Sequence, residues 1–347
     1  MKAARLYGPA DLRIEEVPDP VASPGWVVVR VEACGVCPSD TRVYNGTRPT
    51  GSPWTPGHEI AGVVAATAGG ASARDVVPPD TRVAVDWRSV CGVCYYCGRG
   101  EANFCERRRE FAIAGFAELT RVPEDVLHPL DDSLSFSAAS FCEPLACVLN
   151  AHRGLPPALG SDVVVIGAGP IGLLHLQVAV HRGARVIVTD FLPERLAVAR
   201  RLGAFATIVV SDGDPVAAVK DLTRGRGANA VIVAVGSAAV AETAIAMACK
   251  GGAVNLFAGI HPPTTISLDP NLIHYNQVTL TGSHDYGPGE FATALRLLEN
   301  GIVCVDPLVT GHYPLADIRL AYEATNSHQG LKSIVHPNGL SCSEEPK

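Results

Sequence analysis

Four cysteines crowd into a short, glycine-rich stretch of the chain with the spacing of metal ligands. They follow the pattern C-x2-C-x2-C-x7-C and are Cys91, Cys94, Cys97 and Cys105. Thiolates at such intervals can reach one tetrahedral zinc ion, and a site closed by four thiolates is structural. Four unrelated buried thiols are the alternative, but free cysteines seldom cluster in this way. The sequence therefore predicts a structural zinc loop.

A second set of potential metal ligands is dispersed along the chain. Cys37 stands in a Cys-Pro-Ser-Asp stretch, His58 and Glu59 are adjacent, and Glu143 precedes a proline. A thiolate, an imidazole and a carboxylate can hold zinc and leave one coordination position for a substrate oxygen. Taken singly, each residue also has an ordinary structural explanation, and spacing alone does not connect them.

A glycine-rich turn between an apolar strand and a helix forms the third motif. Its residues, which match G-x-G-x-x-G, are Gly167, Ala168, Gly169, Pro170, Ile171 and Gly172. Such glycines permit the tight turn, the close approach of a pyrophosphate and the packing of helix on strand, and the helix amides then face the phosphates. Glycines that serve packing alone are the alternative. The strand-turn-helix context favours a dinucleotide site.

The residues that follow this turn predict which dinucleotide binds. Asp190 ends the next predicted strand, where a carboxylate can accept hydrogen bonds from the adenosine ribose and would repel a 2′-phosphate. We therefore predict NAD over NADP, although Asp190 could also cap the next helix. Arg195 could stack beside adenine or be a solvated helix residue. Val235, at the end of a later predicted strand, completes the predicted cofactor site.

The elements that position these motifs change character along the chain. Residues 1–150 carry short strand-like runs broken by Gly and Pro, which predicts a mainly β domain. Residues 151–284 alternate apolar strands with helices, the pattern of a parallel Rossmann-type sheet. Strands are predicted at 162–166, 185–190, 207–210, 230–235, 253–257 and 278–281, and helices at 173–182, 193–202 and 239–249. Residues 285–347 begin with a helix near 291–300 and are expected to pack on the first domain.

The composition limits the classes of protein to which the chain can belong. With 47% apolar and 18% charged residues among 347, it is typical of a globular protein long enough for two domains. A net charge of −7 gives no general attraction to nucleic acid or membranes, and neither is an expected partner. The first residues do not read as a secretion signal, and no window approaches the roughly 20 apolar residues that span a bilayer. We expect a cytoplasmic protein.

The order of the motifs resembles the zinc-containing medium-chain dehydrogenases, and the sorbitol and threonine dehydrogenase branch in particular. The motifs are Cys-x-Ser-Asp, Gly-His-Glu-x-x-Gly, the four-cysteine cluster, Glu-Pro-Leu and G-x-G-x-x-G. The resemblance implies an α/β protein with a GroES-like, mainly β catalytic domain and a Rossmann-fold domain. It also implies one catalytic and one structural zinc, NAD as the cofactor, and a homodimer or homotetramer.

The resemblance assigns roles to individual residues. Cys37 and His58 would be ligands of the catalytic zinc, Glu143 or Glu59 would supply the carboxylate directly or through water, and Asp40 would support the ligands. Ser39 would be the first proton acceptor as a secondary alcohol is converted to a ketone.

The sequence departs from its relatives at two places. Arg42 stands where they often have a histidine that relays the proton to solvent, and the stretch from Cys105 to Gly115 is short. These departures change the end of the relay and one wall of the expected pocket.

The substrate is predicted only as a small polar alcohol or ketone. Where sorbitol dehydrogenase-like enzymes have a basic residue after the last Rossmann strand, this chain has Asp285, whose carboxylate could favour an amino alcohol such as an aminocyclitol or amino sugar. A neutral polyol is the second hypothesis, and a solvent-facing loop Asp is the structural alternative. Two other functions stay open: a zinc-binding, NAD-sensing interaction module without turnover, and a zinc-free type of quinone or enone reductase.

Overall fold

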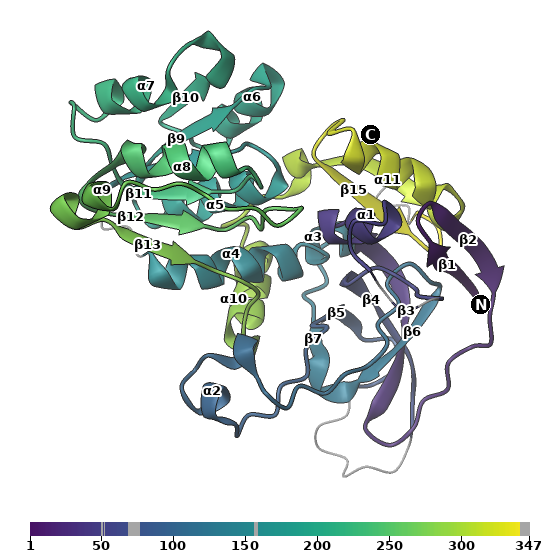
Figure 1. Ribbon diagram of the computed structural model, residues 1–347. Helices are drawn as coiled ribbons and strands as arrows, with labels where there is room; N and C mark the ends of the chain where they lie inside the picture. Colours follow the sequence, from purple (N-terminus) through teal and green to yellow (C-terminus); the bar gives the residue numbers. More distant parts are fainter. Residues whose placement is uncertain (50, 52, 69–76, 156–158, 341–347) are drawn as a thin grey trace. The chain divides into compact units, whose positions relative to one another are not determined.

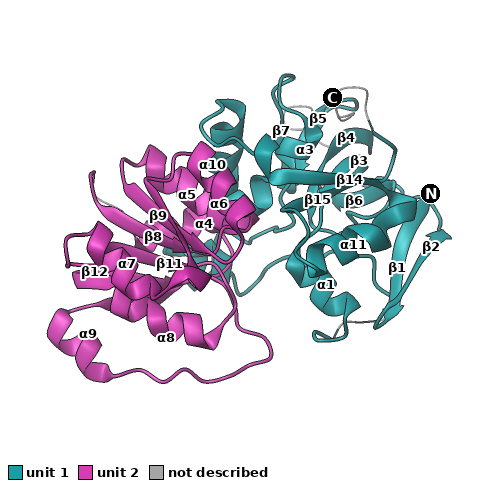
Figure 2. Ribbon diagram, turned by 90° about the horizontal axis from the view of Figure 1, so that it is seen from above, with its two compact units in different colours: residues 1–146, 287–347 teal, residues 147–286 magenta. Residues whose placement is uncertain are grey.

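The chain forms two compact units that alternate along the sequence. The computed structural model describes residues 1–49, 51, 53–68, 77–155 and 159–340. Unit 1 consists of Met1–Ala146 and Gly287–Lys347, and unit 2 of Cys147–Tyr286 (Figure 2). Across these described ranges, every helix is too short or too polar to cross a bilayer.

The described part of unit 2 is built on a six-stranded sheet with the order β10-β9-β8-β11-β12-β13, in which every neighbouring pair is parallel (Figure 1). The strands are β8 (Asp162–Ile166), β9 (Arg185–Asp190), β10 (Ala206–Val209), β11 (Ala228–Val233), β12 (Ala248–Leu256) and β13 (Thr279–Gly282). The helices are α5 (Pro170–His181), α6 (Pro193–Arg201), α7 (Pro215–Leu222), α8 (Ala238–Met247) and α9 (Pro270–Asn276). This topology confirms the predicted Rossmann-type sheet.

The central strands were predictable because both faces of a parallel sheet are covered, so these strands are apolar throughout. The predicted strands at 162–166 and 185–190 coincide with β8 and β9. The helix predicted at 239–249 is present as α8, but its end was misplaced by two residues, because α8 ends at Met247 and β12 begins at Ala248. The short helices α7 and α9 were not predicted, and each begins with an aspartate cap followed by proline.

The described part of unit 1 contains a seven-stranded sheet and a separate two-stranded sheet. The larger sheet has the order β14-β15-β3-β4-β5-β7, with β6 also pairing with β3. Its strands are β3 (Trp26–Gly35), β4 (Glu59–Thr67), β5 (Arg82–Val85), β6 (Leu119–Pro123), β7 (Leu127–Pro129), β14 (Val309–Pro314) and β15 (Lys332–His336), and the smaller sheet pairs β1 (Lys2–Gly8) with β2 (Asp11–Glu16). The helices are α1 (Pro38–Tyr44), α2 (Tyr95–Gly98), α3 (Phe136–Ala139), α10 (Pro288–Glu299) and α11 (Ile318–Asn326).

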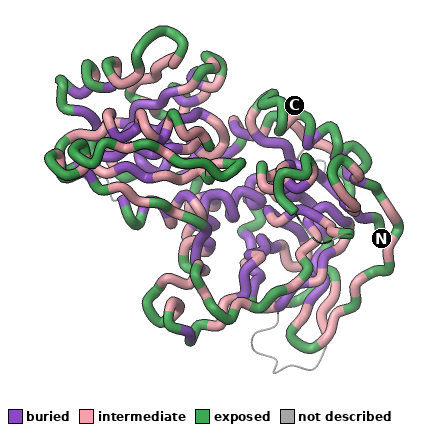
Figure 3. The backbone as a smooth tube through the Cα atoms, in the orientation of Figure 1, coloured by how far each residue is buried: buried purple, intermediate pink, exposed green. Residues whose placement is uncertain are grey.

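Unit 1 is closed by residues from both ends of the chain. Strand β15 runs antiparallel to β3, with Ile334 opposite Gly35 and Val335 opposite Cys34. Ile334 and Val335 are fully buried. Figure 3 shows in purple the buried segments of the chain. Helix α4 (Cys142–Gly154) contains the first boundary between the units, and the second follows Tyr286.

Candidate metal centres and cofactor site

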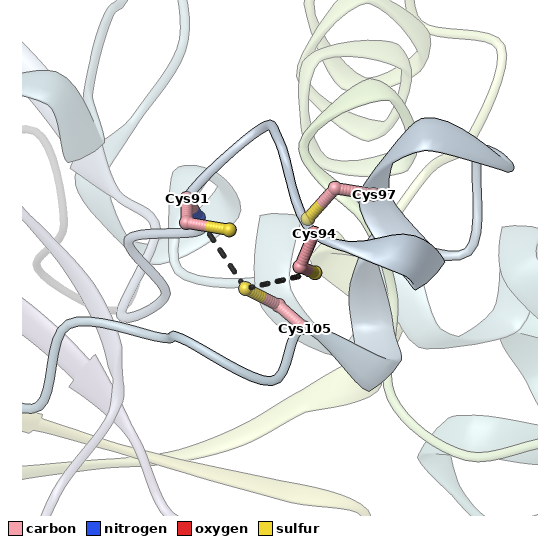
Figure 4. A group of neighbouring side chains, drawn as sticks. All are labelled: Cys91, Cys94, Cys97 and Cys105. Atoms are coloured by element: carbon pink, nitrogen blue, oxygen red, sulfur yellow. Dashed lines mark hydrogen bonds between the residues drawn. The ribbon is translucent and has the colours of Figure 1, made fainter.

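The four cysteines of the predicted zinc loop lie together. One ligand atom from each residue lies within 4.8 Å of every other, and the sulfur atoms face a common centre (Figure 4). The Cys91 amide donates to Sγ of Cys105 over 3.3 Å, and Sγ of Cys94 lies 3.9 Å from the same sulfur. Gly92 and Gly100 have φ values of 70° and 75°, a backbone conformation that favours glycine in this tight loop.

Hydrogen bonding favours the thiolate form at two positions of the loop, because the amide of Val93 lowers the pKa of Cys91 and other amides act on Cys94. The backbone amides of Cys97 and Glu106 lower the pKa of Cys94 to about 6. Burial instead raises the pKa of Cys97 to about 12, and neighbouring sulfurs add to the effect. A cation among these four sulfurs would stabilise all the thiolates, so the donor set fits zinc.

A second group of ligand atoms is formed by Cys37, His58 and Glu59, again within 4.8 Å of one another. Cys37 is the N-cap of α1, and its sulfur accepts the amide of Ser39 over 3.5 Å. Glu59 is the first residue of β4 and lies opposite Gly35 in the β3–β4 register. Strand pairing therefore brings together residues that are about twenty positions apart in the sequence.

Asp40 connects the segment that carries Cys37 to the segment that carries His58. Its carboxylate accepts the Cys37 amide over 3.2 Å and the Gly57 amide over 3.4 Å, and one oxygen lies 3.5 Å from Nδ1 of His58. Burial lowers the pKa of His58, but Asp40 and Cys37 outweigh this and raise the pKa well above its ordinary value. The negative surroundings that favour a proton on His58 equally favour a metal cation.

A buried lysine that the sequence analysis did not single out completes the group. Lys332, on β15, forms an ion pair with Oε2 of Glu59, and both side chains are almost fully buried. Its ammonium also lies 5.9 Å from the centre of the Phe141 ring. A Cβ on Gly35 would stand 2.0 Å from Oε2 of Glu59 and 2.9 Å from Cε of Lys332, so only glycine leaves room for this pair. The sequence feature that could have indicated a buried lysine is its place at the start of an apolar strand.

Glu143 is not one of the three grouped ligands, but it contacts Trp87, which lies beside His58. It is on the first turn of α4, is 7% exposed, and accepts a hydrogen bond from Nε1 of Trp87 over 3.2 Å. The Trp87 ring also stands edge-on to His58, with 6.0 Å between ring centres. Trp87, which the sequence analysis missed, is thus beside both the imidazole and the second candidate carboxylate. Arg42 is partly buried on α1.

The glycine-rich turn connects β8 to α5 as predicted. Gly167 has a φ of 101°, and a Cβ there would stand 2.5 Å from Cγ1 of Val235. A Cβ on Gly172 would stand 1.8 Å from the carbonyl oxygen of Gly167. Gly169 is the N-cap of α5, and Pro170 occupies the first turn. Ile171 is partly buried beside them. Both close approaches explain why the turn requires glycine.

Asp190 and Arg195 lie beside the same turn. The two carboxylate oxygens of Asp190 accept the Ala168 amide over 2.6 Å and the Leu192 amide over 2.9 Å. Nη1 of Arg195 is 4.0 Å from the position that a Cβ on Gly169 would take. The structure therefore gathers the predicted cofactor residues, Val235 included, at one end of the sheet of unit 2.

Asp285 is held within its own loop. It has a φ of 70°, is 8% exposed, and its Oδ1 accepts the amide of Tyr286 over 3.2 Å. The side chain of Asn150 donates to the carbonyl oxygens of Asp285 and His284 over 2.8 and 3.3 Å. A buried carboxylate of this kind is not the solvent-facing loop residue considered above.

Comparison with known proteins places this arrangement in a family. Residues 23–132 match the alcohol dehydrogenase GroES-like domain, and residues 170–300 match the zinc-binding dehydrogenase domain. A sorbitol dehydrogenase from Bacillus subtilis (strain 168) is 30% identical over 97% of this chain and 98% of its own length. The chain belongs to the zinc-type medium-chain dehydrogenases and is therefore an oxidoreductase, with the predicted GroES-like and Rossmann-fold domains.

Two solved structures show the same fold with a nicotinamide cofactor. A zinc-binding dehydrogenase from Sinorhizobium meliloti 1021 bound to NADP has a TM-score of 0.89 and 29% identity, and covers 97% of this chain and 99% of its own. An alcohol dehydrogenase from Escherichia coli CFT073 complexed with NADH has a TM-score of 0.87 and 27% identity, with the same coverage. Membership of this enzyme family favours turnover over an interaction module.

Proposed function

We propose that this dehydrogenase oxidises a secondary alcohol of a small polyol to a ketone with NAD, and carries one catalytic and one structural zinc. The observation that supports it most directly is the convergence of Cys37, His58 and Glu59 within 4.8 Å, separate from the four-cysteine loop. The first set offers three different donors and suits a catalytic site, whereas the second offers four thiolates and suits a structural one.

In this proposal, Cys37 and His58 hold the catalytic metal, and Glu59 or Glu143 supplies the carboxylate. When bound, zinc supplies positive charge that favours loss of the alcohol proton, and the nicotinamide supplies the hydride acceptor. Ser39, whose amide contacts the sulfur of Cys37, is partly exposed, so its hydroxyl accepts the alcohol proton and passes its own proton to solvent. Asp40 keeps the segments that carry Cys37 and His58 at a fixed separation.

The preference for NAD rests on Asp190. A carboxylate beside the glycine turn can accept the ribose hydroxyls and would repel a 2′-phosphate. Asp190→Ala should therefore raise the ratio of kcat/KM for NADP to that for NAD by about tenfold, the effect of losing one such charged contact. An unchanged ratio would remove Asp190 from cofactor selection. Arg195→Ala, measured alongside, reports whether Arg195 contributes to the same choice.

A neutral polyol is the substrate that we favour over an amino alcohol. The dehydrogenase from B. subtilis, to which the chain is similar, is named for sorbitol. The carboxylate of Asp285 is buried and accepts its neighbour's amide, so this geometry gives an ammonium group no clear advantage. Aminocyclitols and amino sugars nevertheless belong in the substrate panel, because a preference for them over matched polyols would restore the amino-alcohol hypothesis.

The test measures NADH formation with polyols, cyclitols, amino sugars and amino alcohols, together with zinc per chain. We expect turnover of polyols and two zinc ions. Cys37→Ala should abolish turnover and remove one zinc, whereas Cys304→Ala, a cysteine outside both groups, should do neither. Full activity of Cys37→Ala would refute the catalytic assignment. The expected homodimer or homotetramer is checked on the same sample by light scattering.

A further inference from the structure

Two histidines to which the proposed function gives no role face each other in the interior of unit 2. Nδ1 of His175, on α5, lies 3.1 Å from Nε2 of His152, on α4. Their exposed fractions are 0% and 2%. One ring therefore donates a hydrogen bond to the other, and this bond joins the C-terminal half of α4 to the helix that follows the glycine turn.

The remaining nitrogens of the pair are unsatisfied. Nδ1 of His152 and Nε2 of His175 are buried and have no hydrogen-bond partner among the described residues. Burial lowers the pKa of His152 to about 4, and the nearby Arg182 acts in the same direction, so the ring is neutral at pH 7. Because a buried polar atom without a partner opposes folding, two apolar side chains of similar size should suit this place as well or better.

The surroundings of α5 explain what a hydrogen bond adds here. From Gly172 to Ala179 the helix is buried, and apart from His175 and Gln177 its side chains there are apolar or absent. Apolar packing against β8 and β9 is tolerant of small shifts, whereas a hydrogen bond has one preferred length and direction. His175 lies about one and a half turns from the N-terminus of α5, so a shift there also displaces the glycine turn.

Helix α4 is a suitable anchor because other bonds hold it. Asn150 donates to the backbone of the loop at His284 and Asp285, and Nη1 of Arg182, directly after α5, donates to the carbonyl oxygen of His152 over 2.9 Å. The His175 ring also packs edge-on to Phe257, just past the end of β12, with 4.6 Å between ring centres. The pair thus joins α5 to a helix that Asn150 also fixes to the backbone at His284 and Asp285, while Arg182 adds a second bond between α5 and α4.

We propose that His152 and His175 are positioning residues that set the register of α5 against α4, and thereby hold the glycine turn in the arrangement that binds the cofactor's pyrophosphate, at some loss of stability. This inference rests on the proposed dinucleotide site. A buried polar pair that fixes register at the expense of stability is a known use of such groups.

The experiment compares His152→Leu/His175→Leu with His152→Gln/His175→Asn, in which the two amides can still donate to and accept from each other. Leu174→Met, a volume-conserving change on the same helix, is the control. NADH binding is measured by fluorescence, with Tm and the separate KM values for NAD and alcohol. For the double leucine variant we expect an unchanged or higher Tm, a roughly tenfold weaker Kd and KM for NAD, and an unchanged KM for alcohol. The amide variant and the control should bind NADH within about twofold of wild type.

Three results would overturn the proposal. A double leucine variant that binds NADH within twofold of wild type would show that the pair only fills space. A variant that fails to fold, or whose Tm and affinity fall together, would show a structural role. An amide variant that binds as weakly as the leucine variant would show that the hydrogen bond is not the relevant feature. Failure of the wild-type protein to bind NADH would instead refute the proposed function.

Discussion

Replacing Lys332 with methionine tests the buried ion pair between Lys332 and Glu59, a residue of the proposed catalytic site. The change keeps most of the apolar stem and removes the ammonium, which in the zinc-free protein leaves the carboxylate of Glu59 buried without a cation. Removing one partner of a buried pair costs about 3–5 kcal/mol, because an uncompensated charge remains in the interior. The contact with Phe141 is also lost and adds to the upper part of this range.

The loss should be visible as a large change in thermal stability. For a unit of about 200 residues, each kcal/mol shifts Tm by about 2–4 °C, so Lys332→Met should lower the Tm of unit 1 by roughly 6–20 °C. Urea denaturation and calorimetry measure it. Lys2→Met, at an exposed position of the same unit, should change the free energy of unfolding by less than about 0.5 kcal/mol.

A double variant separates the charge from the packing. Glu59→Gln with Lys332→Met removes both charges, and we expect it to recover most of the stability that Lys332→Met loses. If Lys332→Met lies within about 1 kcal/mol of wild type, or if the double variant is no more stable than the single one, the reasoning about an uncompensated buried carboxylate is refuted.

Three further predictions concern the zinc loop, the glycine turn and the pH dependence of stability. Cys94→Ser should lose one zinc per chain in metal analysis while Cys249→Ser keeps both, and equal zinc contents would contradict the four-cysteine site. Gly172→Ala places a Cβ 1.8 Å from the carbonyl oxygen of Gly167, so NADH affinity in a fluorescence titration should fall at least about tenfold, and normal binding would contradict the turn's role. The pKa of His152 is about 4 in the folded protein and has the ordinary value of 6.5 in the unfolded chain. As the pH falls, the unfolded chain therefore binds a proton at His152 before the folded protein does. The contribution of His152 to stability above pH 6.5 should therefore decrease by about 3 kcal/mol as the pH falls to 4, and because burial also lowers the pKa of His175, His152→Gln should weaken this dependence in urea denaturation without abolishing it.

The sequence revealed motifs that are local and could not reveal contacts that are distant. The four cysteines and the glycine turn each lie within about fifteen residues, so spacing alone predicted their proximity. The apolar strands β8 and β9 were predicted at their observed bounds because both of their faces are covered. Element boundaries next to glycines, such as the start of β12, were misplaced because the backbone there is compatible with several structures.

The proposed catalytic group shows where sequence reasoning stops. Cys37 meets Glu59 because β3 and β4 pair, and spacing gave no register for that pairing; only the likeness to known dehydrogenases connected the two. Glu59 contacts Lys332 because β15, whose first residue follows Glu59 by 273 positions, joins the same sheet. The sequence also left Glu59 and Glu143 equivalent as carboxylates, whereas the structure groups Glu59 with Cys37 and His58 and pairs Glu143 with Trp87.

The contribution of β15 to unit 1 has a consequence for synthesis on the ribosome. Unit 2 is continuous in sequence, so it can fold as soon as it has emerged. The first 146 residues must wait for their last sheet partner, which the ribosome reaches almost 190 residues later, roughly 10–40 s at ordinary elongation rates. During that interval the end of β3 at Cys34 and Gly35 lacks its partner on one edge, and nascent chains in this state are the ones that a chaperone would need to shield from aggregation.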